Sequence, residues 1–193
     1  MVGKKEEGIF LNREEALELV KENVRRRNMI YHMLAVEAIM KAIARYLKED
    51  EALWGLTGVL HDIDFEETRE KPEKHGLIAE SILDKTVPEE VIRCIKAHNY
   101  RFTGVKPETR MEKALIAGDA VSGLVIACAL VMPSKKIRDV RLETIKKKFR
   151  DKDFARGADR NRIKICEELG ITTDDFFEIA LESIKEIAGE IGL

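Results

Sequence analysis

The stretch that decides the fold is residues 29–47, MIYHMLAVEAIMKAIARYL. Its charged side chains Glu37, Lys41 and Arg45 recur every four residues and define a polar face. Its apolar side chains recur at steps of four and three residues, at Met29, Met33, Val36, Met40, Ile43 and Leu47. Both spacings match the α-helical period, so the sequence predicts an amphipathic helix with one face in a protein core.

The sequence on both sides of this helix carries further helix signals and a poor strand signal. Asn12 followed by Glu15, and Thr172 followed by Asp175, are typical of helix N-termini. No Asn-Gly or Asp-Gly hairpin turn lies between apolar stretches. The fold class is therefore all-α, a single domain over 1–193 with a core at about 12–132 and a helical extension at about 133–193. We expect helices at about 12–24, 29–47, 51–62, from 74, after Pro88, between Pro107 and Pro133, and at 140–149, 160–169 and from 172.

The composition excludes several classes of protein. With 45% hydrophobic and 36% charged residues, the chain has enough apolar material for a core and is not a disordered chain. A formal net charge of −2 argues against nucleic acid or an anionic membrane as a partner. Three widely spaced cysteines without C-x-x-C, and a start without an apolar segment, predict a cytoplasmic protein with no secretory signal. The absence of glutamine beside abundant Glu and Lys indicates a thermophilic source.

One segment, ALIAGDAVSGLVIACALVM at residues 114–132, is long enough to span a membrane. Its two glycines and the acidic Asp119 argue against that interpretation. We therefore expect this segment to be a buried helix of the domain, with no membrane contact.

The residues that can carry chemistry are few. The chain has four histidines, and these are His32, His61, His75 and His98. Three of them, and Asp119, align with apolar stripes of their helices and point inward, while Asp62 follows His61 where a helix ends. A buried carboxylate needs a partner, and no Lys or Arg lies one turn from Asp119 on its stripe. A divalent cation is the other standard partner, and imidazole with carboxylate suits Zn, Fe, Mn, Co or Ni.

The order of these residues resembles a known family. His32, then His61-Asp62, then Asp119 follows the H…HD…D pattern of the HD superfamily of metal-dependent phosphohydrolases, with 29 residues from His32 to His61. The strings LHDID, KHGLIAESIL, KAHN and AGDAVSGL resemble its HDIG-type subgroup. PSKKIRDV followed by KKKFRDKDFARGADR is similar to an uncharacterised branch of predicted HD hydrolases. The resemblance covers about residues 25–130 and implies an HD-domain-like helical bundle with extra C-terminal helices.

The resemblance also implies a ligand set. His32, His61, Asp62 and Asp119 would ligate one divalent metal, and His61 with Asp62 would form the catalytic centre. In family members with two metals, the Asp62 position bridges the ions and two further histidines hold the second. His75 and His98 stand where those histidines are found, which favours two ions over one.

One departure from the family pattern concerns the residues that follow the HD dipeptide. Many HDIG-type members have Gly and then Lys after HD-Ile, whereas this chain has Asp64 and Phe65. The usual positive charge for a phosphate is therefore missing at that point. Asp64 either supports a metal ligand or is an exposed turn residue, and we favour the turn.

A phosphate substrate would still need cations. The candidates for binding it are Lys74 beside His75, Arg101 shortly after His98, and Lys135 and Lys136 after Pro133. Ser134 would begin a helix there whose N-terminal amides add anion affinity. The later basic run at 146–150 is more typical of a solvated face.

The leading hypothesis is a metal-dependent phosphohydrolase that acts on a small phosphate ester, with a nucleotide favoured, through a metal-activated hydroxide. Two alternatives remain: an HD-fold di-iron oxygenase or lyase, and a non-catalytic helical domain that senses a ligand. Nucleic acid has weak support as a substrate because no cluster of stacking aromatic residues accompanies the basic segments. The amphipathic helix after Thr172 either packs on its own domain, which we favour, or forms a homodimer surface.

Overall fold

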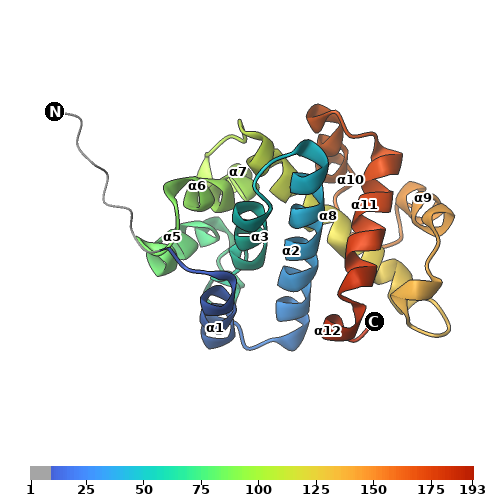
Figure 1. Ribbon diagram of the computed structural model, residues 1–193, viewed down its shortest axis with the longest axis horizontal. Helices are drawn as coiled ribbons and strands as arrows, with labels where there is room; N and C mark the ends of the chain where they lie inside the picture. Colours follow the sequence, from blue (N-terminus) through green and yellow to red (C-terminus); the bar gives the residue numbers. More distant parts are fainter. Residues whose placement is uncertain (1–9) are drawn as a thin grey trace.

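The computed structural model describes residues 10–193, and these contain helices and turns but no β-strand (Figure 1). The expected all-α fold is confirmed for this part of the chain. Residues 1–9, where we expected no secretory signal, lie outside it. The α-helices are α1 (Arg13–Asn23), α2 (Arg27–Leu47), α3 (Glu51–Leu60), α4 (Phe65–Thr68), α5 (Leu77–Leu83), α6 (Glu89–His98), α7 (Tyr100–Thr103), α8 (Arg110–Leu130), α9 (Leu142–Arg150), α10 (Arg160–Ile163), α11 (Thr173–Glu186) and α12 (Ala188–Ile191), and the 3-10 helices are η1 (Pro72–Lys74), η2 (Ile137–Asp139) and η3 (Lys164–Leu169).

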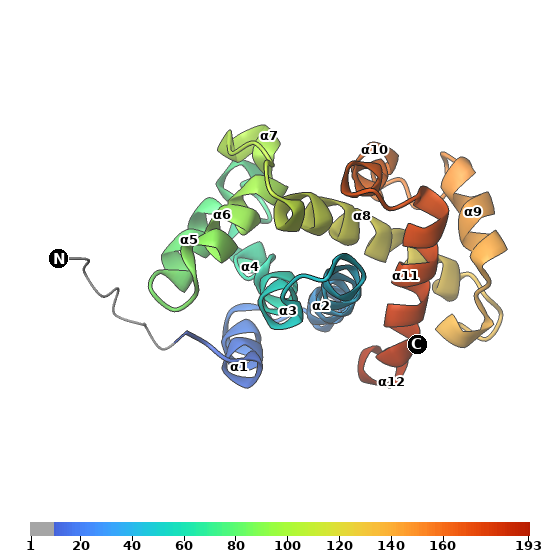
Figure 2. The same cartoon turned by 45° about the horizontal axis from the view of Figure 1, so that its top comes forward.

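The helices α2 and α8, of 21 residues each, organise the molecule. Figure 2 shows α8 running across the view while α2 and α3 are seen nearly end-on, so that α8 crosses both of them. Helices α5, α6 and α7 gather near the N-terminal end of α8, and α9 and α11 lie toward its C-terminal end. The middle of α8 therefore faces α2 and α3, and Asp119 lies on this middle stretch.

Two hydrophobic clusters lie on either side of α2. The larger one joins α2, α8 and the C-terminal helices and contains Ile39, Leu115 and Phe176. The smaller one joins α1, α3, α5 and α6 and contains Val20 and Leu60. Burial of apolar area at roughly 25 cal/mol per Å² makes these clusters the main stabilising contribution to the fold. Because α2 contributes to both clusters, its orientation is fixed from two sides.

Helix boundaries follow local side-chain chemistry. The side chain of Asn12 accepts the backbone N–H of Glu15 at 3.1 Å, while Glu15 accepts that of Asn12 at 2.8 Å, so the expected capping box is present. Thr109 and Glu112 form a second capping box at the start of α8. Thr172 caps α11 as expected. Each such cap contributes about 1 kcal/mol of stability.

Helix α3 lies very close to α2 because it presents glycine to it. A Cβ atom on Gly58 would lie only 2.9 Å from the Cα atom of Glu37. The polar face predicted for α2 is therefore not fully solvated: Glu37 is buried and binds Arg13 and Lys41. The short distance between the two helices brings the end of α3, and with it His61, toward α2.

Helix α8 is long and apolar enough to cross a membrane by length and composition alone. However, 67% of its most apolar window is buried inside this structure, against α2 and the C-terminal helices. Packing in the protein core therefore accounts for its hydropathy, in line with the interpretation from sequence.

The segment after α8 departs from the prediction. No helix begins at Ser134: Lys135 adopts a left-handed backbone conformation, Ser134 hydrogen-bonds Asp139, and only the short η2 follows. The expected helix at 160–169 is α10 continued by η3. Helix α11 packs its apolar face, including Phe176, Phe177, Ala180, Leu181 and Ile184, into its own chain.

Candidate metal centre

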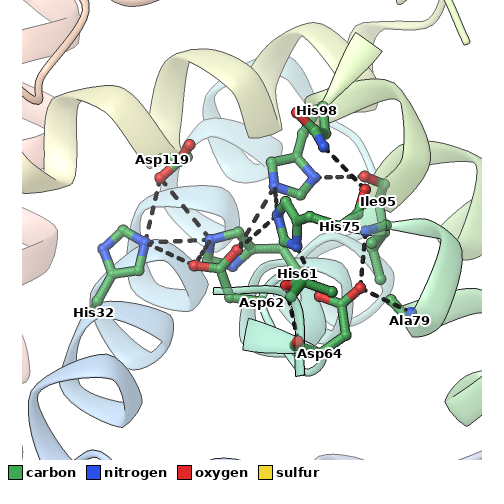
Figure 3. A network of polar contacts seen from close by, with 12 residues as sticks. His32, His61, Asp62, Asp64, His75, Ala79, Ile95, His98 and Asp119 are labelled. Atoms are coloured by element: carbon green, nitrogen blue, oxygen red, sulfur yellow. Dashed lines mark hydrogen bonds and ion pairs between the residues drawn. The ribbon is translucent and has the colours of Figure 1, made fainter. Parts of the chain in front are cut away.

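All six predicted ligands converge on one place, although they come from five separate segments (Figure 3). Helix α2 provides one ligand, the turn after α3 provides two, and the segment before α5, the end of α6 and the middle of α8 provide one each. In that order the ligands are His32, His61, Asp62, His75, His98 and Asp119.

The first group surrounds the end of α3. The Nε2 atoms of His32 and His61 are 3.2 Å apart. Oδ1 of Asp119 lies 3.2 Å from Nε2 of His32, and Oδ2 of Asp62 lies 3.5 Å from Nε2 of His61. Two imidazole nitrogens and two carboxylate oxygens therefore face a common centre.

The second group lies on the other side of Asp62. The Nε2 atoms of His75 and His98 are 2.8 Å apart. Oδ1 of Asp62 lies 3.2 Å from Nε2 of His75 and 3.7 Å from Nε2 of His98. Asp62 thus presents one oxygen to each group, which is the arrangement of a bridging carboxylate.

The histidines are oriented by their Nδ1 atoms. His61 Nδ1 donates to the carbonyl oxygen of Gly58 at 2.8 Å, and His98 Nδ1 donates to that of Ile95. In each case the acceptor lies three residues earlier in the chain, so the last turn of a helix holds the ring. With the proton on Nδ1, Nε2 keeps its lone pair for a cation.

The rings of the other two histidines, His32 and His75, are oriented by hydrogen bonds to side chains. Ser122 donates its hydroxyl proton to the carbonyl of Asp119 at 2.8 Å, so its oxygen accepts the Nδ1 proton of His32 at 3.1 Å. His75 Nδ1 donates to Oδ1 of Asp64 at 2.7 Å. All four rings therefore direct Nε2 inward and anchor Nδ1 behind.

The preferred interpretation of Asp64 as an exposed turn residue is wrong. The residue is only 1% exposed, and besides the Nδ1 proton of His75 its carboxylate accepts the backbone N–H groups of Gly76 at 2.8 Å and Ala79 at 2.9 Å. Gly76 has a φ of +87°, a conformation that glycine adopts without strain. Asp64 therefore fixes the start of α5 and the ring of His75 together.

Arg162 is the residue of the site that sequence reasoning missed. Its Nη2 donates to Oδ2 of Asp119 at 2.9 Å and to the carbonyl of His98 at 3.2 Å. Because Arg162 stands 43 residues after Asp119, no helical spacing relates the two. The inference that Asp119 lacks a nearby cation holds within α8 but not in the folded chain.

Burial and neighbouring charges separate the protonation states of the histidines. Burial lowers the pKa of His61 to about 4, against the opposing effect of Asp62. Burial also works against a charged His75, but hydrogen bonds to Asp62 and Asp64 raise its pKa to about 10. In the absence of a metal, a proton on His75 is thus the cation that faces Asp62.

Both candidate carboxylate ligands are ionised. Burial opposes this, but His61 and His75 hold the pKa of Asp62 well below its ordinary value. Burial likewise opposes ionisation of Asp119, whose pKa is held below its ordinary value by the hydrogen bond to His32 and the charge of Arg162. Ionised carboxylates are the form that a divalent cation requires.

The donor set fits divalent metal ions. His32, His61 and Asp62 form one group that could hold an ion, and Asp62, His75 and His98 form another. Two nitrogens that bind one ion at about 2.1 Å lie about 3 Å apart when the bonds meet at a right angle. The pairs of Nε2 atoms, at 3.2 and 2.8 Å, are close to this spacing. This spacing allows one ion to bind both nitrogens of a pair.

The predicted phosphate-binding cations are less closely placed. Lys74 and Arg101 lie next to the segments of His75 and His98, but Lys74 is exposed and Arg101, 64% exposed, pairs with Asp159. Lys135 and Lys136 are not brought to the ligands: α8 ends eleven residues beyond Asp119, about 16 Å along its axis.

Comparison with known proteins adds one match. A family model described as HD domain matches residues 29–124, which include all six predicted ligands and Asp64 but not Arg162. Searches of curated proteins and of solved structures found no significant match.

Proposed function

Through residues 29–124 this chain belongs to the HD-domain family of metal-dependent phosphohydrolases, and on that premise we propose that it hydrolyses a small phosphate ester, with a nucleotide favoured. The observation that carries the proposal is Asp62, whose two oxygens face two separate pairs of imidazole nitrogens. This is the donor arrangement for two ions that share one phosphoryl group.

The residues that would hold the ions divide into two sets. His32, His61, Asp62 and Asp119 would bind one, and Asp62, His75 and His98 the other. When bound, divalent ions lower the pKa of bound water toward neutrality and neutralise phosphoryl oxygens. The net reaction adds water across the P–O ester bond and yields phosphate and an alcohol.

The side chains themselves contribute orientation and protonation state. His61 is neutral and fully buried, so its Nε2 is a ready donor atom at ordinary pH. Asp62 is ionised and keeps the two sets at a fixed separation. Asp64 keeps His75 in the tautomer with its lone pair on Nε2.

We propose a small phosphorylated molecule, and not nucleic acid, as the partner. The net charge of −2 supports this, as does the distance of Lys135 and Lys136 from the ligands. Lys74 and Arg101 stay candidates for contacts with the rest of the substrate, because they flank His75 and His98 in sequence.

The test is metal analysis of the purified protein combined with a panel of phosphate esters and nucleotides. The protein is reconstituted in turn with Mn, Fe, Co, Ni and Zn, with and without chelator. We expect one to two metal ions per chain and turnover that chelator abolishes. Less than one ion per chain after reconstitution, with no turnover on any ester, would contradict the proposal.

The same panel separates the two alternatives. An activity that needs iron and consumes oxygen would favour a di-iron oxygenase, because this donor set also suits iron. Stoichiometric metal and tight nucleotide binding without any turnover would favour a ligand-sensing domain.

A further inference from the structure

Arg162 contacts the candidate metal centre from outside the HD domain match. Its Nη2 lies 2.9 Å from Oδ2 of Asp119, whereas Oδ1 of the same carboxylate faces Nε2 of His32 at 3.2 Å. The two oxygens of Asp119 are therefore used differently, one by an arginine and one by the ligand group. A charge-assisted hydrogen bond of this kind is about twice as strong as a neutral one.

The same nitrogen also reaches the second ligand group. Nη2 of Arg162 donates to the carbonyl oxygen of His98 at 3.2 Å, and His98 is the last residue of α6. One donor atom thus joins α8, which carries Asp119, to the end of α6. A lysine at this position has a shorter stem, so from the same backbone position its ammonium would not reach both oxygens.

The chain around Arg162 is built to hold it in place. Arg160, two residues earlier, donates to six backbone carbonyl oxygens at distances of 2.6 to 3.3 Å, two of them in the last turn of α9 and four in the loop between α9 and α10. Asp159 caps α10 by accepting the N–H groups of Asn161 and Arg162, and it also pairs with Arg101. Ile163 is fully buried in the larger core. The backbone of Arg162 is therefore fixed on both sides.

We propose that Arg162 is a positioning residue of the metal centre, which holds Oδ2 of Asp119 so that Oδ1 alone is offered to the metal. A carboxylate that binds through one oxygen occupies one coordination position, and one that binds through both occupies two. By holding Oδ2, Arg162 keeps a position free for water or substrate. The segment around α10 is then part of the site and not an appendage to it.

This inference rests on the metal site of the proposed function. The positioning role that it gives to Arg162 differs from a purely structural one. If Arg162 only fastened the C-terminal segment to α6 and α8, its loss would lower the thermal stability and leave the metal coordination unchanged. The coordination of the metal is therefore the quantity to measure, and it does not depend on knowing the substrate.

The experiment compares the full-length protein with Arg162→Gln, Arg162→Lys and a matched control, Arg156→Gln. Arg156 lies in the loop that precedes α10, is exposed, and pairs only with Asp153 among the described residues. Each protein is loaded with Co²⁺, and its affinity is measured by calorimetry and its coordination by visible absorption, which weakens as the coordination number rises. We expect Arg162→Gln to show weaker absorption and a 10- to 100-fold change in Co²⁺ affinity. Arg156→Gln should match the wild type.

Each other outcome has a defined meaning. Unchanged absorption and affinity in a folded Arg162→Gln protein would overturn the positioning role, even if its thermal stability fell. If that variant does not fold, Arg162→Lys decides the question: an altered Co²⁺ spectrum supports the role and an unaltered one overturns it. A wild-type protein that binds no Co²⁺ would overturn both this inference and the proposed function, whereas wild-type binding without ester hydrolysis would overturn only the latter.

Discussion

The two ligand groups that share Asp62 are built in different ways. In the first group, His32 lies in the second turn of α2 and Asp119 lies in the middle of α8, and core packing fixes both of these 21-residue helices. In the second group, His75 and His98 stand at the ends of short elements, and a hydrogen-bond network around Asp64 fixes His75. One group is therefore positioned mainly by apolar burial and the other mainly by polar contacts.

The groups also differ in charge. The first has two carboxylates, Asp62 and Asp119, for two histidines, whereas the second has two histidines and only its share of Asp62. Attraction for a divalent cation increases with the number of nearby anionic oxygens. The first group is thus expected to bind its ion more tightly, and the second to fill at higher metal concentration.

The largest effect should come from the residue common to both groups. Asp62→Asn removes the negative charge from each group, so we expect it to lose both metal ions and all measurable turnover. Metal content by elemental analysis and activity on the best ester of the panel check this. Asp84→Asn is the control, because Asp84 is 66% exposed and its carboxylate pairs only with Lys85 among the described residues. Retention of two ions by Asp62→Asn would exclude the bridging role.

Substituting a histidine of one group only should distinguish the metal binding of the two groups. His98→Ala removes a ligand of the second group only, so we expect the metal content to fall from two ions to one. His32→Ala removes a ligand of the tighter group and should lower the affinity of the first ion to bind. Calorimetric titration of both variants with Mn²⁺ gives stoichiometry and affinity together. Equal losses in the two variants would mean that the groups are not distinct.

An intermediate effect on metal affinity is expected from Asp64, which supports His75 of the second group. Asp64→Asn replaces an acceptor of three hydrogen bonds by a side chain that carries two N–H donors. The second ion should bind 10- to 100-fold more weakly, since supporting partners of metal ligands have about this effect. The free energy of unfolding should also fall by about 1–3 kcal/mol, because buried donors lose their acceptor. Unchanged second-ion affinity would show that His75 does not need Asp64.

The most gradual effect concerns pH. The pKa of His75 is raised to about 10, so below that pH a metal ion must displace its proton. The affinity of the second group should therefore rise about tenfold per pH unit between pH 7 and 9. Zn²⁺ titrations at several pH values measure this, and a flat profile would contradict it.

The same group makes a prediction for the metal-free protein. The protonated form of His75 stabilises the fold fully below its unfolded-state pKa of about 6.5, and this contribution is lost as pH rises toward about 10. The melting temperature of chelator-treated protein should then fall across this range, more than in His75→Asn.

Most of the fold was predictable because its signals are local. The capping residues Asn12 and Thr172 and the apolar period of residues 29–47 act within a few residues of chain, and the helices formed where expected. The convergence of the six candidate ligands was expected from helix faces and from the family pattern. Neither the helix faces nor the family pattern specifies the metal or the substrate.

The misinterpreted residues depend on contacts between distant segments. Local sequence favours an exposed turn at Asp64, because nothing near this residue shows that the N–H groups of Gly76 and Ala79 fold back onto it. The helical period places Glu37 on a polar face, because its ion pair with Arg13 and the close approach of α3 involve other segments of the chain. Arg162 has no sequence relation to Asp119. A charged residue that is buried by tertiary structure cannot be told from a solvated one by periodicity alone.

The hydrogen bond from Arg162 to Asp119 has a consequence for biosynthesis. The ribosome adds His32 early and Arg162 a further 130 residues later, and Asp119 lies between them in the chain. Until Arg162 is added, Oδ2 of Asp119 lacks this hydrogen-bond donor. All six candidate ligands are therefore synthesised before the arginine that contacts Asp119. The contact that we propose positions Asp119 can therefore form only after synthesis has passed residue 162.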